Sequence, residues 1–218
     1  MKRTLSFDDV LLVPQSSDIK SRSEVDLARE LPGHNFTLPI MSSPMDTVTE
    51  IDMALSMLRA GGLGIIHRYN TIKQQASIVS EIRDVLEEEQ NSQVRSIAAA
   101  VGTSGDFYER SKELYDAGAR IFCIDVSHGH HALVKKAIKE LRSKWGSGVT
   151  IIAGNVATPE GYLDLSEWGA DAVRIGIGGG SICSTRIQTG HGVPTFQSVY
   201  DCKHKDGAVI IADGGIKT

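Results

Sequence analysis

A glycine-dense segment, residues 176–185, holds the residues of this sequence best suited to chemistry. It reads Gly-Ile-Gly-Gly-Gly-Ser-Ile-Cys-Ser-Thr and directly follows an apolar run. Glycines lack a Cβ, so their N–H groups can approach an anion closely, and Ser181 adds a hydroxyl donor, which favours phosphate binding. Backbone dipoles around Cys183 lower the pKa of a thiol and favour the nucleophilic thiolate. The alternative is a plain turn with Cys183 as a small buried hydrophobe.

A second glycine pair, Gly214 and Gly215, follows Asp213 at the end of another apolar run. Two glycine loops of this kind can share one phosphate. The Asp213 carboxylate only accepts hydrogen bonds and can hold the hydroxyls of a ribose. Asp125, which ends the run Ile-Phe-Cys-Ile-Asp, is a second candidate of the same type. A β-to-α turn at the glycines and a helix cap at either aspartate are the competing interpretations.

Composition excludes several classes of partner. The chain has 218 residues with 23 Lys and Arg against 27 Asp and Glu, a formal net charge of −4, so we expect no nucleic-acid partner. No apolar run approaches the roughly 18 residues that span a bilayer, and we expect no membrane partner. Cys123, Cys183 and Cys202 lie far apart, which fits neither a metal site nor a disulfide framework. We therefore expect a reducing, cytoplasmic location.

Short apolar runs alternate with longer segments of helical periodicity, which predicts repeated β-strand and α-helix units. Seven runs are predicted strands: residues 38–41, 63–66, 97–101, 121–124, 149–153, 172–175 and 208–212. Six segments between them are predicted helices: residues 50–60, 72–89, 106–117, 132–144, 159–168 and 195–204. Runs this apolar suit parallel strands that helices cover on both faces.

A polar group follows nearly every predicted strand, and this distinguishes the two architectures that fit the alternation. These groups are Ser42-Ser43, His67-Arg68, Gly102-Thr103, Asp125, Gly154-Asn155, Gly176 to Cys183, and Asp213-Gly214-Gly215. A doubly wound open sheet collects ligands mainly at one switch point, whereas a barrel uses the carboxyl end of every strand. We therefore predict an α/β fold of the (β/α)8 barrel type, incomplete here because about seven of the eight strands are present.

Taken together, these motifs resemble the IMP dehydrogenase and GMP reductase family of purine nucleotide oxidoreductases over essentially the whole chain. The matching segments are residues 5–14, Ser42-Ser-Pro-Met-Asp-Thr-Val-Thr-Glu50, Gly61-Gly-Leu-Gly-Ile-Ile-His67, Asp125-Val-Ser-His-Gly129, residues 153–158, residues 176–186 and Ala212-Asp-Gly-Gly-Ile216. The combination of the cysteine loop with the Met45 and Asp213 motifs is highly specific.

The resemblance implies roles for individual residues. Cys183 would attack C2 of the purine of a bound nucleotide, NAD would take up hydride, and hydrolysis of the covalent adduct would give XMP, with Thr185 assisting at that carbon. Residues implied to bind the substrate, IMP, are Ser43, Met45, Arg174, Ser181, Asp213, Gly214 and Gly215. Asp125 and Asn155 are implied on the cofactor side. Carbonyls of Gly178, Gly180 and Cys183 are implied to bind potassium, a hard cation suited to backbone oxygens.

The chain also departs from the family pattern. Only about thirty residues separate His67 from Ile97, where family members commonly carry two regulatory CBS modules, so we expect a single catalytic barrel domain over residues 1–218 without that insertion. The eighth strand, the flap that activates the hydrolytic water and the segment that completes the potassium site have no counterpart in the sequence. We therefore expect the isolated chain to be inactive and to need a C-terminal complementing segment, with a homotetramer in the completed enzyme.

Three functions remain open at this level. Segments 125–130, 155–161 and 181–194 look more like bacterial-type dehydrogenases, which favours oxidation of IMP on the way to guanine nucleotides. The first alternative is the reductase reaction, NADPH-dependent deamination of GMP to IMP. The second, of another class, is a nucleotide-binding module without catalysis, and the role of Cys183 distinguishes it from both enzymes.

Overall fold

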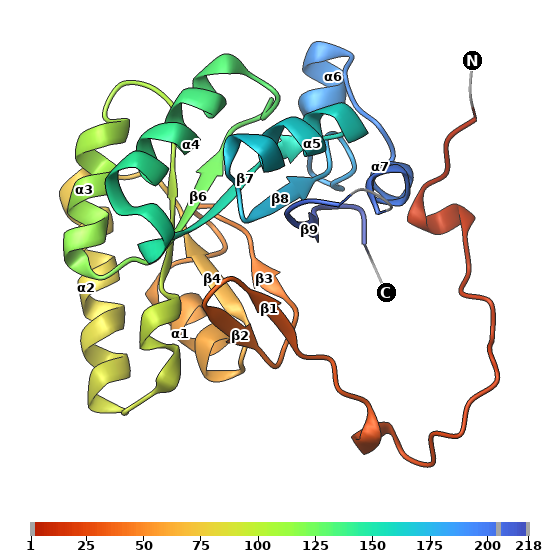
Figure 1. The fold of residues 1–218 in the computed structure, drawn as a ribbon, viewed down its shortest axis with the longest axis horizontal. Coiled ribbons are helices and arrows are strands. Elements are labelled where there is room, and N and C mark those ends of the chain that lie inside the picture. Colours follow the sequence, from red (N-terminus) through yellow and green to blue (C-terminus); the bar gives the residue numbers. More distant parts are fainter. Residues whose placement is uncertain (1–2, 204–205, 217–218) are drawn as a thin grey trace.

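The protein is described by a computed structural model that covers residues 3–203 and 206–216 (Figure 1). Its main feature is a sheet of seven parallel strands in the order β3-β4-β5-β6-β7-β8-β9. The strands are β3 (Met41–Ser42), β4 (Leu63–Ile66), β5 (Ala98–Val101), β6 (Ile121–Asp125), β7 (Thr150–Val156), β8 (Ala172–Ile175) and β9 (Val209–Ala212). Strictly sequential order is the winding of a barrel, because a doubly wound sheet reverses its order at a switch point. The predicted seven-stranded, incomplete barrel is confirmed.

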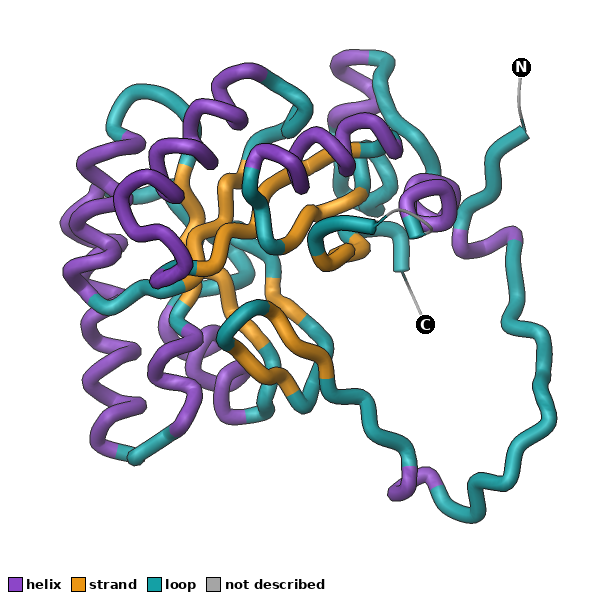
Figure 2. Tube along the Cα trace, in the orientation of Figure 1, coloured by secondary structure: helices purple, strands orange, loops and turns teal. Residues whose placement is uncertain are grey.

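Helices lie on the outside of the curved sheet (Figure 2). They are α1 (Ile51–Arg59), α2 (Ile72–Glu88), α3 (Phe107–Ala117), α4 (Ala132–Trp145), α5 (Pro159–Trp168) and α7 (Thr195–Cys202), whereas α6 (Thr185–Thr189) lies in the loop after β8. Local sequence explains where they begin: Thr71 and Gln74 form a capping box at α2, and Thr158 caps α5 with Pro159 in the first turn. None of the described helices is long and apolar enough to cross a membrane.

The core forms where the strands meet these helices. All residues of β4, β5 and β8 are buried, as expected for strands covered on both faces. The predicted bounds of β4, β8 and α5 agree with the structure at both ends. The last predicted helix, α7, ends at Cys202, and residue 204, its predicted end, lies outside the described residues.

The first strand, predicted at residues 38–41, is instead β3 at Met41–Ser42. The sequence analysis also did not predict four 3-10 helices, at Phe7–Asp9, Arg22–Glu24, Ser92–Ser96 and Gly146–Gly148, or two further elements. A hairpin of β1 (Arg29–Leu31) and β2 (His34–Phe36) precedes the barrel, and the Thr150 hydroxyl donates to the Pro32 carbonyl in its turn at 2.8 Å. Since Thr150 begins β7, the hairpin lies at the amino-terminal end of the strands. The second element is α6, a single short helix that begins within the glycine-dense segment. Both are too short to show a periodicity in the sequence.

Candidate active site

A cavity of about 540 Å³ lies at the carboxyl ends of the strands. Every residue assigned a role above lines this cavity: Ser43, Met45, Asp125, Asn155, Arg174, Gly178, Gly180, Ser181, Cys183, Thr185, Asp213, Gly214 and Gly215. They come from the ends of β3, β6, β7, β8 and β9. The carboxyl ends of parallel strands meet at one edge, so residues distant in sequence converge there. The roles of the individual residues remain predictions.

The two glycine loops pack directly on one another. Gly214 and Gly215 have φ angles of 82° and 80°, in the left-handed region that favours glycine. A Cβ at Gly214 would lie 3.1 Å from the Gly180 nitrogen, and one at Gly215 would lie 2.9 Å from the Gly179 carbonyl oxygen. Only residues without a side chain allow this approach. The loops therefore present their backbones at one place, the arrangement that a shared phosphate requires.

Cys183 is partly exposed and lies within the cavity. The Thr185 hydroxyl, followed by the N–H groups of Thr185 and Gly178 and the charge of Arg186, holds the pKa of the Cys183 thiol below its usual value, against a smaller opposing effect of burial. A lowered pKa increases the thiolate fraction near neutral pH, and the thiolate is the nucleophile. Backbone dipoles were the expected cause; the Thr185 side chain contributes more.

The other two cysteines have different surroundings. Cys123 lies inside β6 and Cys202 in α7, and both are buried. Burial raises the pKa of the Cys123 thiol to about 12, so it stays protonated near neutral pH. Among the cysteines, the partly exposed position at the carboxyl end of the strands belongs to Cys183.

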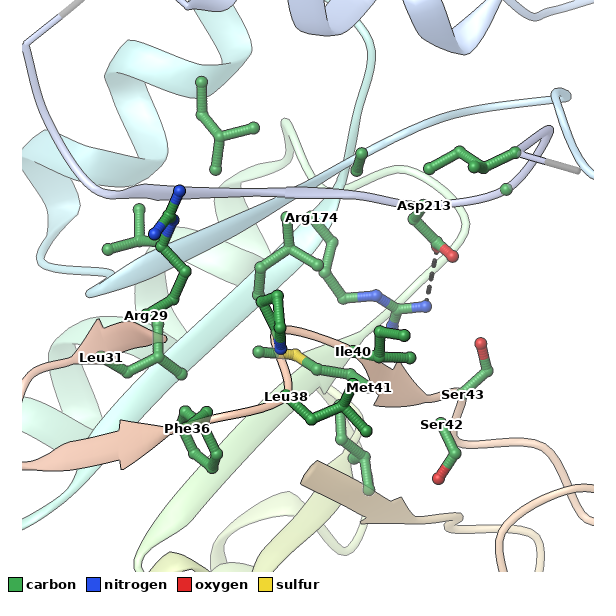
Figure 3. A pocket seen from close by; sticks show the side chains of 18 of the residues that line it. Arg29, Leu31, Phe36, Leu38, Ile40, Met41, Ser42, Ser43, Arg174 and Asp213 are labelled. Atoms are coloured by element: carbon green, nitrogen blue, oxygen red, sulfur yellow. Dashed lines mark hydrogen bonds and ion pairs between the residues drawn. The ribbon is translucent and has the colours of Figure 1, made fainter. Parts of the chain in front are cut away.

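Arg174 joins three strands beneath the cavity. It is 7% exposed, and its guanidinium donates to Asp125 at 2.6 Å and to Asp213 at 2.8 Å (Figure 3 shows the Asp213 contact). Burial lowers the pKa of Arg174, but the carboxylates of Asp213 and Asp125 raise it above its usual value overall, so the side chain remains a cation. Its hydrogen bonds to carboxylates indicate that Arg174 acts on Asp125 and Asp213, in addition to lining the cavity.

The side chain of Asn155 satisfies only part of its hydrogen-bonding capacity within the described residues. Its side-chain nitrogen donates to Asp213 at 2.5 Å and to the Gly176 carbonyl at 2.8 Å. Its side-chain oxygen Oδ1 is buried and has no hydrogen-bond partner among the described residues. A buried acceptor without a partner costs free energy, and a donor supplied by a ligand removes that cost.

The loop after β3 positions Ser43 and Met45 through its own hydrogen bonds. The Ser43 carbonyl accepts from the Met45 N–H at 2.8 Å and from the hydroxyl of Thr49 at 2.6 Å. Thr49 is fully buried, so this contact is shielded from water. The loop is therefore held against the cavity by residues of its own motif.

Among the cavity residues without an assigned role in the sequence analysis, Arg68 and Tyr69 bring a charged and an aromatic side chain. The Arg68 guanidinium donates to the Asp125 carbonyl at 3.3 Å. Arg68 also lies 5.7 Å from the centre of the Tyr69 ring. Both follow β4, so their place at a strand end was the available signal. His67, just before them, is buried and contacts Glu50 at 2.5 Å.

The donor set for a cation is limited to backbone oxygens. Among the described residues, no group of three or more His, Cys, Asp or Glu side chains could hold a metal ion. The carbonyl oxygen of Gly180 already accepts from the Cys183 N–H at 3.2 Å. Carbonyls of Gly178, Gly180 and Cys183 suit a hard cation in kind, but three oxygens from one loop are fewer than such ions coordinate.

Comparison with known proteins agrees with the resemblance. A model of the IMP dehydrogenase / GMP reductase domain matches residues 4–218. IMP dehydrogenase of Nitrosopumilus maritimus is 30% identical, covering 100% of this chain and 71% of that protein. The enzyme of Cryptosporidium parvum is 35% identical, covering 98% of this chain and 62% of that protein, so the chain spans less than two thirds of this relative.

A solved structure agrees as well. GMP reductase C318A of Trypanosoma brucei superposes with a TM-score of 0.90 at 26% identity, over 100% of this chain and 79% of that one. The family match covers almost the whole sequence, and the superposition covers the whole barrel described above. The chain belongs to the IMP dehydrogenase / GMP reductase family.

Proposed function

We propose that this chain carries the site for NAD-dependent oxidation of IMP to XMP through a covalent adduct at Cys183. The observation that carries the proposal is the partly exposed Cys183, whose lowered thiol pKa is due first to Thr185, inside a cavity that two glycine loops border. The names of the curated relatives support the dehydrogenase reaction.

The Cys183 thiolate forms a bond from Sγ to C2 of the purine, and the displaced electron pair moves to the ring nitrogen, which takes up a proton. C2 then loses hydride, which NAD would accept when bound, and the ring nitrogen releases its proton as the double bond is restored, leaving a thioimidate. Water adds at C2 and gives one proton to the ring nitrogen; Cys183 departs as thiolate and the other proton of the water is released, which gives XMP. The Thr185 hydroxyl, hydrogen-bonded to Sγ, stabilises the Cys183 thiolate before it attacks C2 and after it leaves the adduct.

The remaining residues bind and orient the reactants. Ser181, Gly214 and Gly215 hold the phosphate, Asp213 holds the ribose, and Ser43 and Met45 contact the nucleotide. Arg174 acts on the substrate by fixing Asp213. NAD, held on the side of Asp125 and Asn155, supplies the hydride acceptor when bound. The unpartnered Asn155 Oδ1 fits a ligand that brings a hydrogen-bond donor.

A monovalent cation, potassium, belongs to the proposal as well. It would rest on the carbonyls of Gly178, Gly180 and Cys183 and hold the cysteine loop in shape. Because one loop supplies too few oxygens, the cation needs further ligands from another segment. The single-domain organisation without CBS modules, the homotetramer and the cytoplasmic location are parts of the same proposal.

The test separates binding from chemistry. The chain is incubated with iodoacetamide with and without IMP, and modified cysteines are identified by mass spectrometry. Cys183 is expected to react faster than Cys123 and Cys202, and IMP is expected to protect it. The Cys183→Ala variant should bind IMP in calorimetry about as well as the wild type. Equal labelling of the three cysteines, or labelling of Cys183 that IMP does not change, would refute the proposal.

The reductase reaction is the second candidate, favoured by the superposition on a GMP reductase. Absorbance of the nicotinamide band distinguishes the two reactions. Growth of the band with IMP and NAD supports the dehydrogenase, and decay with GMP and NADPH supports the reductase. A binding module would give neither, and Cys183→Ala would then change nothing.

A further inference from the structure

Thr195, the first residue of α7, carries a buried hydroxyl that the fold leaves unpaired. Helix α7 packs beside β8 and β9 (Figure 1), and Thr195 is only 3% exposed there. Its oxygen Oγ1 has no hydrogen-bond partner among the described residues, and Thr195 is not one of the residues that line the candidate active-site cavity. A buried hydroxyl without a partner costs free energy, so this hydroxyl lowers the stability of the free protein.

The Thr195 side chain fills a space that three glycines leave free. A Cβ at Gly179 would lie 2.0 Å from Thr195 Oγ1, and one at Gly215 would lie 3.7 Å from it. A Cβ at Gly176 would lie 3.4 Å from Thr195 Cγ2. The φ angle of Gly179 is not positive, so the close approach of Thr195, and not the backbone conformation, requires glycine at this position. Thr195 therefore lies beside both glycine loops, behind the cavity.

The peptide between Gly179 and Gly180 connects this space with the cavity. A Cβ at Gly215 would lie 2.9 Å from the Gly179 carbonyl oxygen, and Thr195 Oγ1 approaches the same point. The carbonyl and the hydroxyl therefore border one small space, and a hydroxyl can donate to a carbonyl.

This peptide is trans, so the Gly179 carbonyl and the Gly180 N–H point in opposite directions. A hydroxyl that holds the Gly179 carbonyl thus turns the Gly180 N–H away from Thr195, towards the cavity that Gly180 lines. Backbone N–H groups turned into such a cavity bind anions. The Thr195 hydroxyl can therefore act on an anion in the cavity without touching it.

We propose that Thr195 is a positioning residue of the phosphate site. An anion between the glycine loops attracts the Gly180 N–H, the peptide plane rotates, and the Gly179 carbonyl accepts a hydrogen bond from the Thr195 hydroxyl. This bond then fixes the Gly180 N–H towards the anion. The inference rests on the proposed function, which assigns the phosphate of the nucleotide to these loops. Removal of the hydroxyl should therefore weaken the complex without destabilising the free chain.

Two substitutions at position 195 isolate the hydroxyl. Thr195→Ser and Thr195→Ala both lose the methyl group that lies towards Gly176, and only Thr195→Ser keeps the hydroxyl. Calorimetry measures binding of IMP to the 218-residue chain. Thr195→Ser should bind within about twofold of the wild type, whereas Thr195→Ala should bind about threefold to tenfold more weakly, as expected for one lost hydrogen bond.

The second measurement is urea unfolding without ligand. The midpoint for Thr195→Ala should equal or exceed that for Thr195→Ser, because the hydroxyl has no partner in the free protein. A hydroxyl with a purely structural role predicts the reverse order. Inorganic phosphate gives a third readout: it should shift the Gly180 amide signal in NMR spectra of the wild type and Thr195→Ser, and shift it less in Thr195→Ala.

Ser198→Ala is the matched control. Ser198 lies one turn further along α7, is 1% exposed and also has an unpartnered hydroxyl among the described residues. It is not among the nearest neighbours of any glycine in the two loops. Ser198→Ala should therefore leave the affinity for IMP unchanged.

The outcomes separate this inference from the proposed function. Equal IMP affinities of Thr195→Ser and Thr195→Ala would exclude the positioning role and leave the proposed function standing. A midpoint for Thr195→Ala well below that for Thr195→Ser would show that the hydroxyl is already paired in the free protein, which also overturns the inference. No binding of IMP or phosphate by the wild type would overturn the phosphate site and the role of Thr195 together.

Discussion

Cys183 and Thr185 are two positions apart, and the Thr185 side chain lowers the pKa of the Cys183 thiol. Thr185 begins α6, and its hydroxyl is the largest cause of the lowered Cys183 pKa. Thr185 therefore has a measurable electrostatic effect in the free protein, before any substrate is present. This makes its contribution testable by titration of Cys183 alone.

Thr185→Val removes this hydroxyl at nearly constant volume. The pKa of Cys183 is lowered in the wild type, so the thiolate is present at a lower pH than for an ordinary thiol, and the variant should move the titration upward. Alkylation near neutral pH should then slow by roughly threefold to tenfold, because the thiolate fraction falls about tenfold per pH unit below the pKa. The measurement is the pH profile of iodoacetamide labelling, with Thr47→Val, at an exposed position that does not line the cavity, as control. An unchanged profile for Thr185→Val contradicts the assignment.

Arg174 acts between elements, because its contacts join β8 to the ends of β6 and β9. Asp125 and Asp213 would face each other as two anions without it. The position of β9 depends on Arg174 more than that of β6 does, because β9 pairs with β8 alone among the described strands, whereas β6 pairs with both β5 and β7. We therefore regard Arg174 as the residue that fixes the spacing of these strand ends.

Arg174→Met should destabilise the protein by about 2 to 3 kcal/mol, somewhat less than a fully buried pair because both carboxylates keep some solvent contact. Urea denaturation measures the free energy of unfolding, and binding of IMP should weaken in parallel if Asp213 holds the ribose. The control is Lys112→Met, which removes an exposed ion pair with Asp116 and should leave stability unchanged. Equal stabilities of Arg174→Met and the wild type would show that the ion pairs of Arg174 with Asp125 and Asp213 do not stabilise the fold.

The whole molecule has a barrel body and an N-terminal segment that contacts it at its ends. Residues 10–28 contribute few hydrogen bonds to the body, whereas the strands and helices form one buried core. Local stability therefore differs sharply between the two parts. This difference is a property of the tertiary arrangement, and limited proteolysis reports it.

Trypsin should cut first after Lys20 or Arg22, both exposed in the segment, because proteases need accessible, extended chain. Lys73 is also exposed but lies in α2, and cleavage there should be slower by at least about tenfold. Mass spectrometry of timed digests identifies the first cut. The Lys20→Gln, Arg22→Gln double variant should lose the early fragments, and early cleavage within α2 would contradict the prediction.

Much of this protein could be predicted from its sequence. Apolar periodicity predicted six of the seven strands and the outer helices, while β3 lies at Met41–Ser42 instead of residues 38–41. The polar groups at the ends of β6, β7, β8 and β9 line the cavity, since parallel strands bring their carboxyl ends together, whereas Gly102 and Thr103 after β5 do not. The missed elements are short: the β1–β2 hairpin and α6 have too few residues for a periodic signal. Arg68 and Tyr69 carried the right position but no distinctive motif.

The sequence by itself determined the parallel barrel, its strand order and the place where the cysteine and the glycine loops meet. The tertiary structure decided how Arg174 reaches Asp125 and Asp213, 49 and 39 residues away, and that β3 and β9 each have one strand neighbour among the described residues. The physical reason is range: helix and strand patterns follow from neighbours a few residues apart. Ion pairs across strands and open sheet edges depend on how distant segments pack in three dimensions.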